Sequence, residues 1–226
     1  MYKIEKYYER LKNGESTFFL TPIDVMELKG KFKKNEYKIF KPTKDSEKVI
    51  FYNKKTPNIC LYEIITNNSL KHQEILGSMF GLNIDESMFG DIIIDNNRYF
   101  IFIIDMIEDY FISNFNKIGK CNIALKKLDS DYLKDYERKY EEVELIVTSL
   151  RIDTVISRII HSNRDSIKDR IKNKEIYLNH SLLKKIDYKL REGDIFSVRK
   201  FGKYKFVKVT NTTKKDNYII LLDKYI

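Results

Sequence analysis

The sequence is poor in the residues and runs that would mark a metal-binding, disulfide-bonded or membrane protein. Cys60 and Cys121 are its only cysteines, and neither a CxxC pair nor a nearby histidine cluster suggests zinc or a disulfide framework. The longest apolar runs, residues 92–94 and 99–104, are far shorter than the roughly 18 residues that cross a bilayer. The first ten residues are too charged for a signal peptide. We therefore expect a cytoplasmic protein with reduced thiols and no membrane partner.

Long tracts of glycine, serine or proline are missing as well, which argues against a disordered chain. The 226 residues include only 8 Gly and 3 Pro, while 42% are hydrophobic and 13% aromatic, values typical of a folded protein. This length accommodates one large domain or two to three small ones. We expect more than one.

The usual sequence signatures of a catalytic site are also absent. The chain has neither a GxGxxG string nor a GxxxxGK[ST] loop for a nucleotide. His72, His161 and His180 are scattered without a carboxylate or nucleophile pattern, so surface or packing roles are expected for them. We predict no catalytic residue, no metal, no cofactor and no small-molecule substrate.

What the chain has instead is a concentrated excess of positive charge. The formal net charge is +9, with 42 Lys and Arg against 33 Asp and Glu. Residues 150–208 alone hold 16 Lys and Arg against 7 Asp and Glu, while residues 1–149 hold 23 against 24. A net +9 within one segment that also shows a folded pattern favours a polyanionic partner over a merely solvated surface.

The order of predicted elements indicates an α+β protein of three parts. Residues 1–56 read as a small α/β lobe, in which Thr21 caps a helix that begins at Pro22. Residues 57–145 read as a ferredoxin-like β-α-β-β-α-β domain of the kind found in RRM proteins, followed by a charged linker helix over residues 129–144. Residues 146–226 form the basic module, which ends in a β-hairpin.

The basic module is predicted to pack two short helices on a small sheet. Ser149 is the expected cap of the first helix, and Ser162 with Asp165 forms an [ST]-x-x-[DE] start for the second. In a later strand, two lysines at 203 and 205 alternate with Tyr204 and Phe206, so one face should be basic and the other buried.

Cations of this module should gather on exposed faces. Arg151 and Arg158 lie seven residues apart and share one helix face. Arg164, Lys168 and Lys172 are each four apart and form a stripe, whose mutual repulsion an anionic partner would relieve.

Several strings of the module resemble an S4 RNA-binding domain. They are Ser149-Leu-Arg-Ile-Asp153, Asn163-Arg164, Ile171-Lys-Asn-Lys-Glu-Ile-Tyr-Leu-Asn179 and Glu192-Gly-Asp-Ile-Phe-Ser-Val-Arg199. The wider chain resembles the bacterial YlmH family, in which an S4 domain follows an RRM-like middle domain. That second likeness rests on the strings His72-Gln-Glu-Ile-Leu-Gly-Ser78, Phe89-Gly-Asp-Ile-Ile-Ile94 and Lys117-Ile-Gly-Lys120.

The chain departs from the family pattern in two places. Arg199-Lys-Phe-Gly-Lys203 stands where the family has Arg-Gly-Phe-Gly-Arg, so charge is kept but the planar fork of one arginine is lost. The first lobe lacks the family's Gly-Gly-Tyr loop and its Ala-Glu-Arg-Lys-Arg run and keeps only the stretch from Lys41 to Lys48. We therefore do not assign to this chain any function that the loop has in the family.

The resemblance implies a non-catalytic protein that grips structured RNA in a translation or ribosome quality-control role. Ribosomal RNA of the large subunit is the expected partner, and tRNA carried by such complexes is a further candidate. The expected RNA contacts are Arg151, Arg158, Asn163, Arg164, Lys168, Lys172, Lys174, Arg199, Lys200, Lys203 and Lys205.

Three alternatives stay open at this point. S4 modules also anchor RNA-modifying enzymes such as pseudouridine synthases and methyltransferases, but the chain lacks the Gly-Arg-Leu-Asp string that carries a catalytic aspartate. Asp153 is instead expected to pair with a neighbouring basic residue. A DNA-binding module agrees with the charge but not with the S4 likeness. Tyr99 or Phe102 of the middle domain is a candidate for stacking on a base, although a core role is the more frequent one for such residues.

Overall fold

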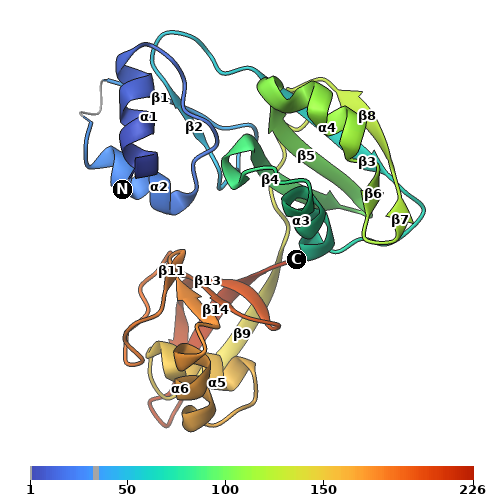
Figure 1. Ribbon diagram of the computed structural model, residues 1–226. Coiled ribbons are helices and arrows are strands. Elements are labelled where there is room, and N and C mark those ends of the chain that lie inside the picture. The colour runs from blue at the N-terminus through green and yellow to red at the C-terminus, as the bar shows by residue number, and fades with distance from the viewer. Residues whose placement is uncertain (1, 33–35) are drawn as a thin grey trace. The chain divides into compact units, whose positions relative to one another are not determined.

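The computed structural model describes residues 2–32 and 36–226, which form two compact units over residues 1–137 and 138–226 (Figure 1). Both units combine antiparallel sheets with separate short helices, so the expected α+β class is confirmed. None of the helices in the described part of the chain has the length and apolar character that a bilayer crossing requires.

The first unit begins with two helices and a small hairpin. Its elements up to residue 52 are α1 (Tyr2–Lys12), α2 (Pro22–Lys29), β1 (Lys38–Phe40) and β2 (Ile50–Tyr52), and α2 begins at Pro22 as predicted. Thr21 caps α2 as expected, because its side chain accepts a hydrogen bond from the backbone N–H of Asp24 and the Asp24 carboxylate accepts one from the backbone of Thr21. This reciprocal capping fixes the start of the helix.

A four-stranded antiparallel sheet in the order β4-β5-β3-β8 forms the centre of this unit. Its strands and helices follow one another as β3 (Ile59–Ile65), α3 (His72–Gly81), β4 (Phe89–Asp95), β5 (Arg98–Ile104), α4 (Glu108–Asn114) and β8 (Ala124–Leu128). Short elements between them are the 3-10 turns η1 (Glu86–Met88) and η2 (Asp105–Ile107) and the strands β6 (Lys117–Ile118) and β7 (Cys121–Asn122). The turn between β4 and β5 has positive φ at Asn96 and Asn97, as a two-residue hairpin requires.

Side chains cover both faces of this sheet. Helices α3 and α4 pack on one face, where Tyr99 is 2% exposed, and the N-terminal lobe packs on the other, where Phe102 is 1% exposed. Gly90 permits this second contact, because a Cβ at that position would lie 2.9 Å from Cε1 of Phe19. The lobe and the sheet therefore share one close-packed core.

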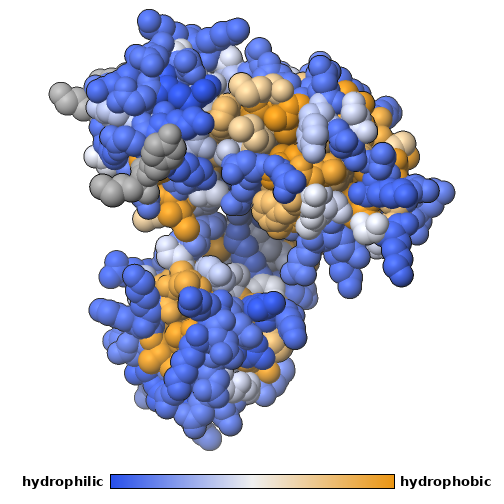
Figure 2. Space-filling view, in the orientation of Figure 1, coloured by the Kyte–Doolittle hydropathy of each residue, from blue (hydrophilic) through white to orange (hydrophobic). Residues whose placement is uncertain are grey.

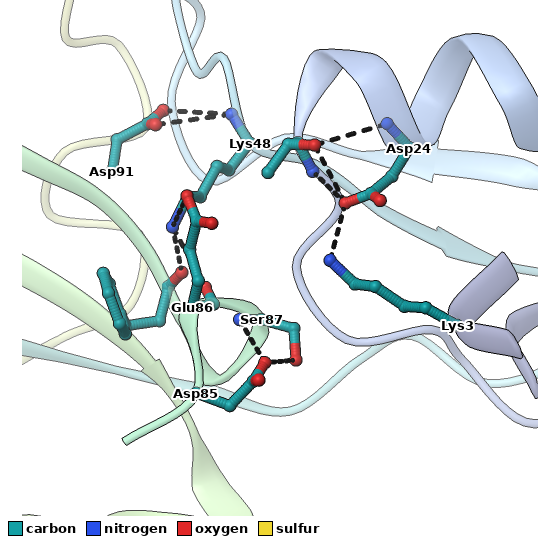
Figure 3. Close-up of polar contacts among 9 residues, drawn as sticks. Lys3, Asp24, Lys48, Asp85, Glu86, Ser87 and Asp91 are labelled. Carbon is teal, nitrogen blue, oxygen red and sulfur yellow. Dashed lines mark hydrogen bonds and ion pairs between the residues drawn. The ribbon is translucent and has the colours of Figure 1, made fainter. Parts of the chain in front are cut away.

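Polar contacts fasten the lobe to the same sheet (Figure 3). The Lys48 ammonium donates to the carbonyl oxygens of Glu86 and Phe89 at 3.0 and 3.1 Å, and the Lys48 backbone N–H donates to Asp91. Burial lowers the pKa of Lys48 because desolvation disfavours its charged form. Lys48 ends the Lys41-to-Lys48 stretch, and its ammonium is used for packing within the unit.

The second unit is a six-stranded antiparallel sheet in the order β11-β10-β12-β13-β14-β9 with two helices on one face. Its elements are β9 (Tyr140–Val147), α5 (Ile152–Ile159), α6 (Arg164–Lys172), β10 (Ile176–Leu178), β11 (Ser181–Leu182), β12 (Ile195–Val198), β13 (Gly202–Thr212) and β14 (Tyr218–Tyr225). The last two strands form the expected C-terminal hairpin.

The predicted charged helix over residues 129–144 is wrong. Residues 130–135 form turns and residues 136–139 have no regular structure, while β9 begins at Tyr140 and pairs with β14 along its whole length. The apolar and aromatic residues of this segment belong to the first unit, where Leu133 is buried and Tyr136 packs against the shared core. Strand pairing with a segment about 80 residues away outweighs the local pattern.

Candidate nucleic-acid interface

The two helices of the second unit begin at residues other than the predicted caps. Arg151 occupies the N-cap position of α5 without a side-chain cap, whereas the predicted cap, Ser149, contacts the hydroxyl of Thr154 at 3.1 Å. Asn163, and not Ser162, caps α6, since its Oδ1 accepts a hydrogen bond from the backbone N–H of Ser166 at 2.9 Å. The Asn163 side-chain oxygen is therefore engaged within the protein.

Asp153 joins the starts of both helices. Its carboxylate is fully buried and accepts two hydrogen bonds of 3.1 Å from Arg151 and one of 2.6 Å from Arg164. Burial alone would raise the pKa of Asp153, but the two guanidinium groups outweigh it and lower that pKa. The expected pairing of Asp153 with a neighbouring basic residue is confirmed. Reversing the charge of Arg164 would consequently test folding more than binding.

The predicted stripe along α6 is partly neutralised by the protein itself. Besides the pair between Arg164 and Asp153, Lys168 binds Asp165 at 2.8 Å. Lys172, the third member of the stripe, has no ion-pair partner among the described residues. The stripe thus supplies less unpaired charge than the spacing of its residues predicted.

A second group of cations gathers where the end of α6 meets the turn after β12. The backbone N–H of Arg199 donates to the carbonyl oxygen of Glu175 at 2.9 Å, and the guanidinium of Arg170 binds the Glu175 carboxylate and lies 4.9 Å from the Phe201 ring centroid. These contacts hold two segments together that are about 25 residues apart. We call the four exposed cations of these segments the basic edge: Lys172, Lys174, Arg199 and Lys200.

The basic edge lacks internal neutralisation. Across residues 2–32 and 36–226 none of its four cations forms an ion pair. Lys174 and Lys200 adopt positive φ angles of 57° and 73°, which places both at turns. Unpaired cations on turns retain their full charge for an external anion.

The outer face of the six-stranded sheet carries the remaining predicted cations. Tyr204 and Phe206 point into the core and are 5% and 1% exposed, so the predicted alternation with Lys203 and Lys205 is confirmed. The Lys203 ammonium lies 4.6 Å from the centroid of the Tyr225 ring, a cation–π distance.

Tyrosines flank this lysine across the sheet and were missed from the sequence. Register places Tyr177 opposite Ser197, Ser197 opposite Lys203, and Tyr225 opposite Tyr140. Tyr177 is 41% exposed. Their only sequence signal is a period-two pattern within short strands, which does not reveal which strands are neighbours.

Arg158 stands apart from both groups. It lies in the last turn of α5 and lines a hollow together with residues from β9 and with Asn217, which directly precedes β14. Arg158 has no ion-pair partner in the part of the chain that the structure describes.

Neither Tyr99 nor Phe102 is exposed on the sheet of the first unit, so neither can stack on a base there. Tyr99 lies under the helices and its hydroxyl accepts a hydrogen bond from the backbone N–H of Leu70, while Phe102 lies under the lobe. The core role is therefore confirmed for both residues. Among the described residues no group of three or more His, Cys, Asp or Glu side chains is placed to hold a metal ion.

The charge of the chain separates by unit. Residues 1–137 hold 21 Lys and Arg against 21 Asp and Glu, and residues 138–226 hold 21 against 12. The whole net charge of +9 therefore belongs to the second unit. Hydrophilic residues cover most of the face of this unit that Figure 2 shows.

Comparison with known proteins finds a family model, a curated relative and a solved structure that resemble this chain. Residues 57–132 match a family model described as "Putative RNA-binding domain in YlmH". The "Ribosome-associated protein quality control protein P2" of Bacillus subtilis (strain 168) is 26% identical over 159 residues, which is 69% of this chain and 61% of that protein. A solved structure, "Cell division protein ylmH from Streptococcus pneumoniae", is 24% identical with a TM-score of 0.47 and covers 59% of this chain and 91% of its own.

Proposed function

We propose, given that the chain belongs to the YlmH family, that it is a non-catalytic RNA-binding protein of ribosome-associated quality control. Its partner is structured RNA, in the first place ribosomal RNA of the large subunit, and tRNA held in such complexes is a further candidate. This role is a cytoplasmic one. The match spans 61% of the length of the Bacillus subtilis relative, so the activity of that whole protein comes to this chain only as part of the proposal.

The unpaired cations of the second unit carry the proposal. The net +9 of residues 138–226 includes the basic edge, Lys205 and Arg158, none of which is neutralised by a described acid. Lysine and arginine side chains bind RNA by neutralising phosphates and releasing condensed counterions. Structured RNA is recognised largely through shape, phosphate and 2′-hydroxyl contacts, which suits cations that are fixed on a rigid sheet and helix pair.

The fold also supports the finer domain assignments. The strand order β4-β5-β3-β8 with two helices on one face supports a ferredoxin-like, RRM-like middle domain after the lobe of residues 1–56. Helices α5 and α6, which pack on one face of the second sheet, support an S4 domain over residues 146–226.

We place the main RNA contact in the second unit, outside the segment that matches the family model. Residues 57–132 contain 6 Lys and Arg against 11 Asp and Glu, and both faces of their sheet are covered. An acidic segment with a buried sheet is poorly suited to phosphate binding. Within this proposal Arg151, Arg164 and Lys168 support the surface through their ion pairs, and Lys172, Lys174, Arg199, Lys200, Lys203 and Lys205 contact RNA.

Sedimentation with large ribosomal subunits tests this assignment. Lys172→Glu with Lys200→Glu reverses two exposed, unpaired charges of the basic edge, and Lys6→Glu with Lys38→Glu makes the same change on the first unit. We expect the wild type and the control to sediment with the subunits and the basic-edge variant to remain at the top of the gradient. Co-sedimentation of the basic-edge variant with a native circular dichroism spectrum would overturn the assignment.

A second measurement distinguishes an RNA-binding protein from an RNA-modifying enzyme. If the chain acts only by binding, ribosomal RNA from cells with and without its gene should contain the same modified nucleosides. Loss of one modification would favour an RNA-modifying enzyme.

A further inference from the structure

A hollow beside the C-terminal half of α5 is distinct from the basic edge. Its volume is about 390 Å³, within the range of about 300–1,000 Å³ that is usual for ligand pockets. The residues that line it come from β9 and the residue after it, from α5 and the turn after it, and from the turn before β14: Ile146, Val147, Thr148, Thr154, Ser157, Arg158, Ser162 and Asn217. None of them belongs to the basic edge.

The side chains that line the hollow are of the kinds that bind an anion and the hydroxyl groups of a ligand. Arg158 is the one charged residue among those eight, and no acid is among them. The hydroxyls of Thr148 and Ser162 and the side-chain amide of Asn217 have no hydrogen-bond partner among the described residues. Three unused polar groups beside an unpaired guanidinium suit phosphate oxygens and sugar hydroxyls.

The frame of the hollow is fixed by hydrogen bonds that leave these groups available. The Ser157 hydroxyl donates to the carbonyl oxygen of Asp153 at 2.7 Å, and the backbone N–H of Ser162 donates to the carbonyl oxygen of Ser157 at 3.0 Å. Asn217 is held through its backbone N–H, which donates to the hydroxyl of Thr213 at 3.1 Å. Ile146 is 48% exposed and gives one wall an apolar surface.

We propose that this hollow binds one backbone phosphate of RNA together with the ribose attached to it. Arg158 neutralises the phosphate, Thr148, Ser162 and Asn217 bind its oxygens and the 2′-hydroxyl, and Ile146 packs against the sugar. The inference rests on the proposed function and deepens it, because it gives the RNA a second anchor with its own residues. A free mononucleotide has the same phosphate and ribose chemistry, so the test must separate the two sources.

The test measures the affinity of the full chain for a large-subunit ribosomal RNA transcript at several KCl concentrations. Arg158→Gln removes one phosphate contact, so we expect about tenfold weaker binding and a plot of log K against log salt that is shallower by about 0.9. Thr148→Val with Ser162→Ala keeps the charge, so we expect about fivefold weaker binding with an unchanged slope. Lys6→Gln, an exposed lysine of the first unit, is the matched control and should leave both quantities unchanged.

Each outcome has a separate meaning. Failure of the wild type to bind the transcript at any salt concentration would overturn the proposed function. Wild-type affinity and slope in Arg158→Gln would overturn only the hollow as an RNA contact. Whether the hollow binds a free mononucleotide is tested by titrating adenosine 5′-monophosphate into the wild type and into Arg158→Gln, followed by NMR. Binding of the nucleotide that is lost in Arg158→Gln, with RNA binding unaltered, would also overturn the RNA contact.

Discussion

Asp153 shows how one buried acid can decide what nearby cations do. It holds the guanidinium groups of Arg151 and Arg164 on the same carboxylate while fully buried. Sequence analysis singled out all three residues and predicted that Asp153 pairs with a basic residue. It did not reveal that one acid binds two arginines, because that geometry depends on how α6 turns back on α5.

Replacing this acid should therefore affect stability first. Asp153→Asn leaves two guanidinium groups facing a neutral amide, and breaking a fully buried ion pair costs about 3–5 kcal/mol. Because the Arg164 side chain is 57% exposed, we expect a smaller loss of about 2 kcal/mol in the free energy of unfolding, measured with urea. The matched control is Asp165→Asn, whose carboxylate is 82% exposed, so that its replacement should change the free energy of unfolding much less than that of Asp153. Equal effects of the two substitutions would contradict this account of Asp153.

Glu108 links stability to pH in the first unit. Hydrogen bonds from Lys127, Tyr62 and Cys60 lower its pKa from 4.5 to about 2. Because the folded-state pKa is below the unfolded one, the stabilisation is complete above about pH 4.5 and is lost as the pH falls toward 2. Urea unfolding should show the wild type more stable than Glu108→Gln by about 1–2 kcal/mol at pH 7, after allowance for solvent screening. This difference should shrink between pH 4.5 and 3. A difference that is constant over this range would exclude the linkage.

At the scale of elements, prediction succeeded where the signal was local. The helix at Pro22 was found because capping residues act on their immediate neighbours. Strand β9 was missed because its partner β14 lies about 80 residues further along the chain. Its apolar residues Val143, Leu145 and Val147 repeat with the period of a strand, a signal that the dense charge around them obscured.

The outer face of the second sheet supports a further prediction at this scale. Tyr177 lies in a cross-strand row with Ser197 and Lys203 and is 41% exposed, so we expect its ring to pack against RNA. Tyr177→Ala should weaken binding of the ribosomal RNA transcript about five- to tenfold, since stacking on a base is worth about 1–3 kcal/mol. The salt dependence should stay as in the wild type, because no charge is removed. A changed slope, or unchanged affinity, would argue against this contact.

For the whole molecule, charge was the most informative property of the sequence. The excess of cations in residues 150–208 predicted the unit that carries the net +9, and the structure divides the chain into a neutral unit and a basic one. Which of these cations remain unpaired could not be predicted. The ion pairs of Arg164 and Lys168 and the unpaired state of Lys172 follow from the exact placement of acids around α6.

The most direct test of the account is ultraviolet cross-linking of the full chain to large ribosomal subunits, followed by mass spectrometry of the cross-linked peptides. The account predicts cross-links in residues 158–205, at the basic edge, around Arg158 and at Tyr177. Cross-links confined to residues 57–132, with residues 138–226 unmodified, would contradict the claim that the basic unit grips the RNA.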